Sequence, residues 1–148
     1  MHTTNHAHTT AARTSGLRTF QGSVLSHRFT EEAELDGIGN MIALTPSDEI
    51  NRLAVEQFLP TFGRAHLFRL PPSSQKLKDV HHAGRILFAD DLDAEELRNR
   101  LQAGARLRAT KLTEQFGPEQ YSEQYGESAR PLFLITPEKK LSIVTTDN

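Results

Sequence analysis

Histidines are the residues in this chain whose type could most readily support metal chemistry. Of the seven, His2, His6 and His8 stand near the start of the sequence, where His6 and His8 would share a face of a strand but not of a helix. Chain ends are poorly ordered and hold metal ligands loosely, so the pattern does not favour a metal site there. His81 and His82 are adjacent and point apart in regular structure, so they are not expected to chelate a metal.

Carboxylates form a second group that could do chemistry, at Asp90, Asp91, Asp93, Glu95 and Glu96. A general acid–base pair would require two of them to converge on a pocket. They also stand where a helix is expected to begin, and free backbone N–H groups and the helix dipole favour negative charge there. The spacing of Asp93 and Glu96 resembles a capping box. We therefore interpret the acidic group as a helix start.

Other catalytic patterns are missing from the sequence. No serine stands in a Gly-x-Ser-x-Gly turn, and Gly37 and Gly39 alone do not make a dinucleotide-binding fingerprint. Cysteine is absent, which excludes a thiol nucleophile, a disulfide and a thiolate metal site. We therefore expect no catalytic residue and no enzyme activity in this chain.

Charge and hydropathy exclude further classes of function. The formal net charge is −2, and the short basic stripe of Arg106, Arg108 and Lys111 is interpreted as a solvated strand face, so no nucleic-acid partner is expected. No apolar run approaches the ~20 residues that a membrane span requires. The first residues have no apolar stretch typical of a signal peptide. These features favour a cytoplasmic protein.

The elements that must position any site alternate over the first 70 residues. The expected helices cover 6–14, 26–35 (with Thr30 as its cap) and a segment beginning with Thr45 as cap and Pro46 as first residue. This last helix should kink or stop at Pro60. The expected strands cover 17–20, 41–44 and 65–70. Such alternation predicts a parallel sheet with helical crossovers.

The second half has a different pattern. A Pro/Ser-rich linker over 71–76 precedes a strand at 85–89, a helix at 91–104, helical turns at 118–125 and a hairpin of 132–136 with 141–145. The fold class predicted is α/β, with a truncated Rossmann-like parallel sheet in residues 1–72 followed by a small α+β subdomain in residues 73–148.

Several segments, taken in order, carry a family resemblance. Residues 12–25, 35–39, 43–51 and 62–72 resemble the later part of a TrkA-N (RCK-type) Rossmann domain. The version they are most similar to is the cytosolic C-terminal region of bacterial sodium/hydrogen (cation:proton) antiporters. Residues 84–88, 107–113 and 131–137 resemble the end of those proteins. The resemblance covers nearly the whole chain and depends on the order and spacing of the segments.

The resemblance also points to residues that could bind a nucleotide such as NAD or ATP. The family's first strand and Gly-rich loop have no counterpart here, and neither does the acid that bonds a ribose. What remains of the implied cofactor pocket is Gly22 and Ser23 on one loop and Thr45 and Asp48 on the next. The alternative interpretation of these residues is a turn glycine and a helix cap.

A sheet without its central strand would expose backbone edges. The sheet could re-form with a partner chain, the sequence could be the tail of a longer transporter, or a regulatory subunit could dimerise across the edge. The resemblance implies a homo-oligomer that regulates a cation antiporter or potassium transport system through the transporter's membrane domain. The alternatives are a fragment of an NAD(P)-dependent oxidoreductase and a stand-alone protein-interaction module.

Overall fold

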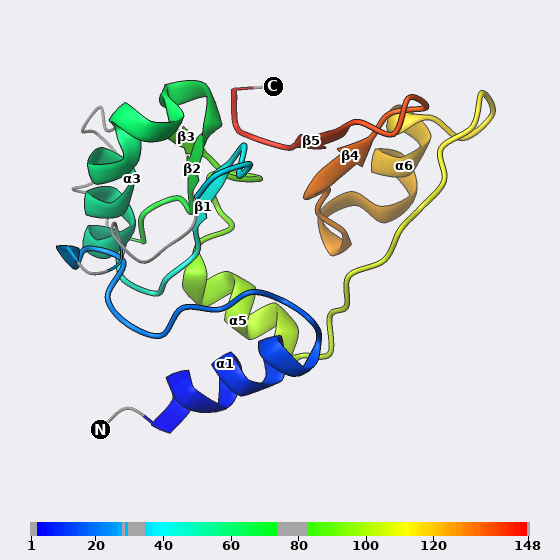
Figure 1. The fold of residues 1–148 in the computed structure, drawn as a ribbon. Coiled ribbons are helices and arrows are strands. Elements are labelled where there is room, and N and C mark those ends of the chain that lie inside the picture. The colour runs from blue at the N-terminus through cyan, green and yellow to red at the C-terminus, as the bar shows by residue number, and fades with distance from the viewer. Residues whose placement is uncertain (1–2, 28, 30–34, 74–82, 148) are drawn as a thin grey trace. The chain divides into compact units, whose positions relative to one another are not determined.

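The computed structural model describes residues 3–27, 29, 35–73 and 83–147. The chain divides into two compact units, Met1–Gly39 and Asn40–Asn148. Figure 1 shows the helices and strands of each unit. In the described residues, the regular elements fall mostly in the second unit, which contains all of the strands.

Among its described residues, the first unit contains helix α1 and a segment that is mostly irregular. Helix α1 spans Thr3–Thr14, so the expected helix is confirmed and begins three residues earlier than predicted. The strand expected at 17–20 is wrong. Phe20 instead packs edge-to-face on Phe29 with ring centroids 5.0 Å apart, and Arg13 Nε donates to Thr19 Oγ1 at 2.6 Å. Most of the helix expected at 26–35, with its cap Thr30, lies outside the described residues.

The second unit is built on a three-stranded parallel sheet in the order β1-β2-β3. Strand β1 is Met41–Ala43, helix α3 is Asp48–Phe62, the 3-10 turn η1 is Arg64–His66, β2 is Leu67–Arg69 and β3 is Arg85–Ile86. Helix α3 connects β1 to β2 in parallel, as the alternating pattern predicted. Each strand is shorter than the apolar run that predicted it.

Helix α3 begins two residues later than predicted. Ser47, not Thr45, is the N-cap, and its hydroxyl accepts a hydrogen bond from the Ile50 N–H at 3.3 Å. The cause is that the Thr45 hydroxyl is hydrogen-bonded to the side chain of Asn51. At the other end the helix runs past Pro60 to Phe62, and the N–H of Gly63, whose φ is 72°, bonds to the Leu59 carbonyl at 3.0 Å. Pro60 therefore lies in the last turn and does not itself end the helix.

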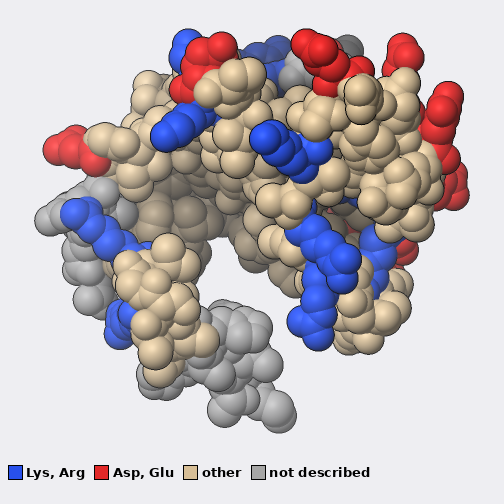
Figure 2. Space-filling model, turned by 90° about the vertical axis from the view of Figure 1, so that its right-hand side faces the viewer, with Lys and Arg blue, Asp and Glu red and all other residues tan. Residues whose placement is uncertain are grey.

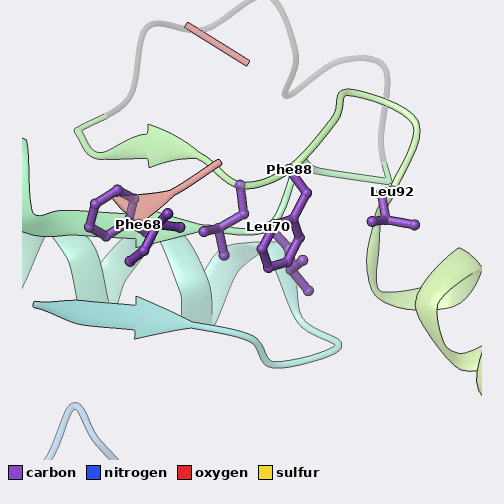
Figure 3. Packing of buried hydrophobic residues seen from close by; sticks show 6 residues of the cluster. Phe68, Leu70, Phe88 and Leu92 are labelled. Atoms are coloured by element: carbon purple, nitrogen blue, oxygen red, sulfur yellow. The ribbon is translucent and has the colours of Figure 1, made fainter. Parts of the chain in front are cut away.

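One hydrophobic cluster of this unit lies around the ends of β2 and β3, apart from the buried residues of α3. Phe68, Leu70, Phe88 and Leu92 gather there (Figure 3), together with Leu87 and Ile143. The cluster draws its residues from both sides of the boundary expected between residues 72 and 73, and β2 pairs with β3 across the same point. The parallel sheet and its core therefore extend through the segment that the sequence pattern separated.

The other described residues of the second unit form two helices and a hairpin. Helix α5 is Ala94–Gln102, α6 is Pro118–Tyr125 with the turn η2 at Gly126–Ser128, and strands β4, Phe133–Ile135, and β5, Leu141–Ile143, pair antiparallel. The expected hairpin and both helices are confirmed. The strand expected at 106–113 is wrong, since this segment is exposed and has no neighbouring strand in the described part of the chain.

The acidic residues at the start of α5 include the N-cap of the helix. Asp93 is the N-cap, and its Oδ1 accepts hydrogen bonds from the N–H groups of Glu95 and Glu96 at 3.0 and 2.9 Å. This carboxylate caps the helix, as predicted. In the described residues, no helix is both long and apolar enough to cross a membrane.

Candidate functional site

The loop between β1 and α3 is fixed by a buried asparagine. Asn51, only 2 % exposed, accepts from the Thr45 N–H at 2.9 Å through its Oδ1 and donates to the Thr45 carbonyl at 2.8 Å through its Nδ2. The Thr45 hydroxyl donates to the same Oδ1 at 2.7 Å and accepts from the Ser47 N–H at 3.3 Å. These bonds occupy Thr45 within the loop, so its predicted role as helix cap is wrong.

Asp48 joins the start of α3 to the segment that follows β2. Its Oδ2 accepts a hydrogen bond from the Ser73 N–H at 3.0 Å. The carboxylate stands in the first turn of the helix, where the dipole favours negative charge. Thr45 therefore lies in the loop before α3 and Asp48 in the first turn of the helix, and each accepts a hydrogen bond from a backbone N–H group.

The other two predicted site residues belong to the first unit. Ser23 accepts from the Leu25 N–H at 3.2 Å through its hydroxyl, and its carbonyl accepts from the Ser26 hydroxyl at 2.7 Å. A Cβ at Gly22 would lie 2.8 Å from Cε1 of Phe20. Both residues shape a local turn in the first unit, whereas Thr45 and Asp48 belong to the second unit.

Arg69 is the residue of greatest chemical interest that sequence reasoning missed. It ends β2, is 5 % exposed, and its Nε has no hydrogen-bond partner. Burial is the largest influence on its guanidinium and lowers its pKa. Asp48 and Glu56 act in the opposite direction, and Arg52 adds to the lowering. An arginine whose Nε is buried without an acceptor, as it is here, is rare in folded proteins.

Both missed residues left a signal in the sequence. Arg69 interrupts an apolar run, between Phe68 and Leu70, and a charge in a buried strand is unusual. Asn51 stands three residues before Ala54 and seven before Phe58, a helical spacing that puts a polar residue on an apolar face. Polar residues at expected core positions mark either a structural hydrogen-bond network or a ligand site. Asn51 is the first case, and Arg69 remains without a structural explanation.

The sheet has two edges that differ in their hydrogen bonding. Beyond β3, the Phe88 N–H donates to the Val144 carbonyl at 2.9 Å and the Thr146 N–H donates to the Ile86 carbonyl at 3.1 Å. Residues 144–146 thereby cover that edge. Among the described residues, β1 pairs with β2 alone, so its other edge is open.

The histidines do not form a site in the described structure. His2, His81 and His82 lie outside the described residues, and His6 and His8 fall in helix α1, where residues two apart do not share a face. Within the described ranges, no three histidine or acidic residues are grouped so as to hold a metal ion. Both signs of charge stand on the face drawn in Figure 2.

Comparison with known proteins adds no relative to these observations. No protein-family model matches the chain, and neither a curated protein nor a solved structure is significantly similar to it. The candidate site is therefore defined by its own geometry. It comprises the open edge of β1 and, around the end of β2, Arg69 with the charged residues of α3.

Proposed function

We propose that this chain is a cytoplasmic regulatory domain of a monovalent-cation transport system, either a cation:proton antiporter or a potassium transporter. It acts by pairing with a second copy across the open edge of β1 and by coupling its conformation to the membrane domain of the transporter. The resemblance to TrkA-N domains supports the link to transport. The single structural observation that supports pairing is the open edge.

The order of the strands agrees with this proposal. Rossmann sheets have the strand order 3-2-1-4-5-6. If the segment that contains β1, α3 and β2 corresponds to the later part of such a domain, then β1 and β2 correspond to strands 4 and 5, and β3 stands at the position of strand 6. The open side of β1 is then the side on which the central strand of that fold would lie. Another strand at this place would complete a larger sheet.

The backbone of β1 directs unpaired groups toward this side. The Ala43 carbonyl accepts from the Leu70 N–H at 3.2 Å, so Ala43 faces β2. Backbone groups of successive residues in a strand point in opposite directions, which turns the N–H and C=O of Ile42 and Leu44 away from β2. These are the donors and acceptors that an added strand would bind.

The side chains of β1 favour a second copy as the added strand. Ile42 and Leu44 are 36 % and 53 % exposed, and residues 40–44 carry no charge. Natural edges are commonly protected by lysine, proline or an inward-pointing charge, and this one has none of them. An uncharged apolar strand is complementary to itself, since two copies can approach without like-charge repulsion.

Regulation would follow from two arrangements of the pair that a transporter distinguishes. A ligand or the membrane domain shifts the balance only if it binds one arrangement more tightly than the other. No catalytic step is needed for this role.

The proposal is tested by cation flux in cells that lack the chain. We expect the deletion to change rubidium or sodium efflux, the full-length chain to restore it, and the Ile42→Lys variant to fail. Leu101→Lys is the matched control, because Leu101 is also exposed, at 63 %, but lies on α5. Unchanged efflux in the deletion strain would refute the transport role. Full restoration by Ile42→Lys would refute the role of the β1 edge.

A further inference from the structure

We propose that Arg69 is the anchor of a binding site for a small oxyanion, a carboxylate or a phosphate, at the end of β2 beside the first turns of α3. This inference concerns a different part of the second unit from the open edge of β1 and does not depend on pairing between copies.

The guanidinium of Arg69 has an N–H donor that meets no acceptor. A guanidinium has five N–H donors and no acceptor, so it is satisfied only by oxygens or other acceptors around it. Arg69 is 5 % exposed, and its buried Nε meets no acceptor. Leaving a charged group in this state costs free energy that folded proteins avoid, which indicates that an acceptor is supplied from elsewhere.

The carboxylates of α3 near Arg69 accept hydrogen bonds from other groups. Glu56 is bound by Arg52, whose Nη1 lies 2.9 Å from both Oε1 and Oε2. Asp48 accepts from the backbone N–H of Ser73 at 3.0 Å. Both carboxylates influence Arg69 through the field but have other hydrogen-bond partners. Neither carboxylate accepts a hydrogen bond from the Nε of Arg69, which has no partner.

A second arginine, Arg130, also has a buried Nε but makes an ion pair, and so serves as a comparison for Arg69. The Nε of Arg130 is likewise buried without a partner, but its Nη2 donates to Asp91 Oδ2 at 2.6 Å and a quarter of its side chain is exposed. Arg130 has an ion pair and water to neutralise it. Arg69 is less exposed to solvent and, among the described residues, makes no ion pair of this kind, so Arg130 is a matched control for it.

The class of ligand follows from this chemistry. Guanidinium groups bind planar or tetrahedral oxyanions through parallel N–H···O bonds, which are stronger than bonds between neutral groups. The local formal charges of Asp48, Arg52, Glu56 and Arg69 sum to zero. A singly or doubly charged small anion is therefore favoured over a polyphosphate, which would be repelled by the two acids.

The test observes Arg69 itself in the full-length chain. In ¹H–¹⁵N spectra of the labelled protein, the Arg69 Nε–H signal is assigned by its absence in Arg69→Lys. Sodium phosphate and sodium acetate are then titrated separately, with sodium chloride at equal ionic strength as the reference. We expect this signal to move and saturate with phosphate, with acetate or with both. The anion that saturates it at lower concentration identifies the source.

Calorimetry with the better anion gives the second readout. Arg69→Gln should weaken binding about tenfold or more, because it removes charge-assisted hydrogen bonds. Arg130→Gln should leave the affinity within about twofold, since Arg130 is already paired. The proposal is overturned if the Arg69 signal responds to phosphate and acetate no more than to chloride, a result that requires no variant to fold. It is also overturned if Arg69→Gln binds as tightly as the natural chain.

Discussion

The two edges of the parallel sheet are built from similar short strands but differ in whether another segment of the chain hydrogen-bonds to them. The edge beyond β3 is covered by residues 144–146, whose backbone bonds to Ile86 and Phe88, and it adjoins the apolar core. The edge of β1 has apolar side chains of its own, Ile42 and Leu44, but no described segment pairs with it. One edge is closed by the chain itself, and the other is unpaired among the described residues.

This difference teaches that the exposed apolar residues of β1 are not simply the consequence of a small core. The same unit closes its opposite edge with a hairpin strand and a buried threonine, Thr145, which is 1 % exposed. The predictions below test each side of this contrast.

Truncation of Leu87 should have the largest effect. Leu87 is fully buried beside the closed edge, so Leu87→Ala should lower the free energy of unfolding by about 2–5 kcal/mol in urea titrations. Leu44→Ala, at the open edge, should change it by less than about 0.5 kcal/mol because Leu44 is half exposed. Equal losses in the two variants would remove the contrast between the edges.

Gly84 precedes β3 and should resist substitution strongly. A Cβ there would lie 2.7 Å from Val55 Cγ1 and 3.3 Å from the Leu67 carbonyl, at a φ of +89°. Gly104 has a similar φ, +94°, with nothing within 4 Å, so Gly104→Ala isolates the backbone cost. Gly84→Ala should be less stable than this control by roughly 1–3 kcal/mol, from thermal and urea unfolding. Identical losses would show that the closed side is not tightly packed.

Thr146→Pro should lower the free energy of unfolding moderately, because it weakens the pairing at the closed edge. It removes the N–H that donates to the Ile86 carbonyl at 3.1 Å, which should cost about 1–2 kcal/mol of unfolding free energy. Thr146→Ala retains the N–H, and Thr146 is exposed, so it should be close to neutral. If both variants have the stability of the natural chain, residues 144–146 do not seal the edge.

The smallest effect is expected in the hairpin turn that leads to the closed edge. Hydrogen bonds from its own backbone N–H and from the Thr136 side chain lower the pKa of Glu138. A lowered pKa means that this stabilisation is present above the ordinary value and is lost as pH falls through the folded-state value. Glu138→Gln should therefore show a shallower loss of stability than the natural chain between about pH 5 and 3. An unchanged acid profile would contradict this role.

Sequence patterns predicted the regular elements better than the site. Helical spacing and turn residues located α3, α5, α6 and the final hairpin, because those signals are local. The strand expected at 17–20 failed, since alternation of side chains cannot supply a neighbouring strand.

Long-range contacts explain the remaining differences. Thr45 was expected to cap α3, but Asn51, the fourth residue of the helix, holds it in the loop instead. Arg69 was not singled out because its importance depends on burial and on carboxylates that are bound elsewhere. Such features depend on which side chains the fold brings together, which local sequence does not specify.

Amide hydrogen exchange at Ile42, measured at two protein concentrations, tests the central claim most directly. The Ile42 N–H points to the open side of β1, whereas that of Ala43 faces β2 and serves as an internal control. We predict that protection of Ile42 rises with protein concentration while that of Ala43 stays constant, because a second copy binds the open edge. Fast exchange of Ile42 at both concentrations, or protection independent of concentration, would contradict pairing across β1.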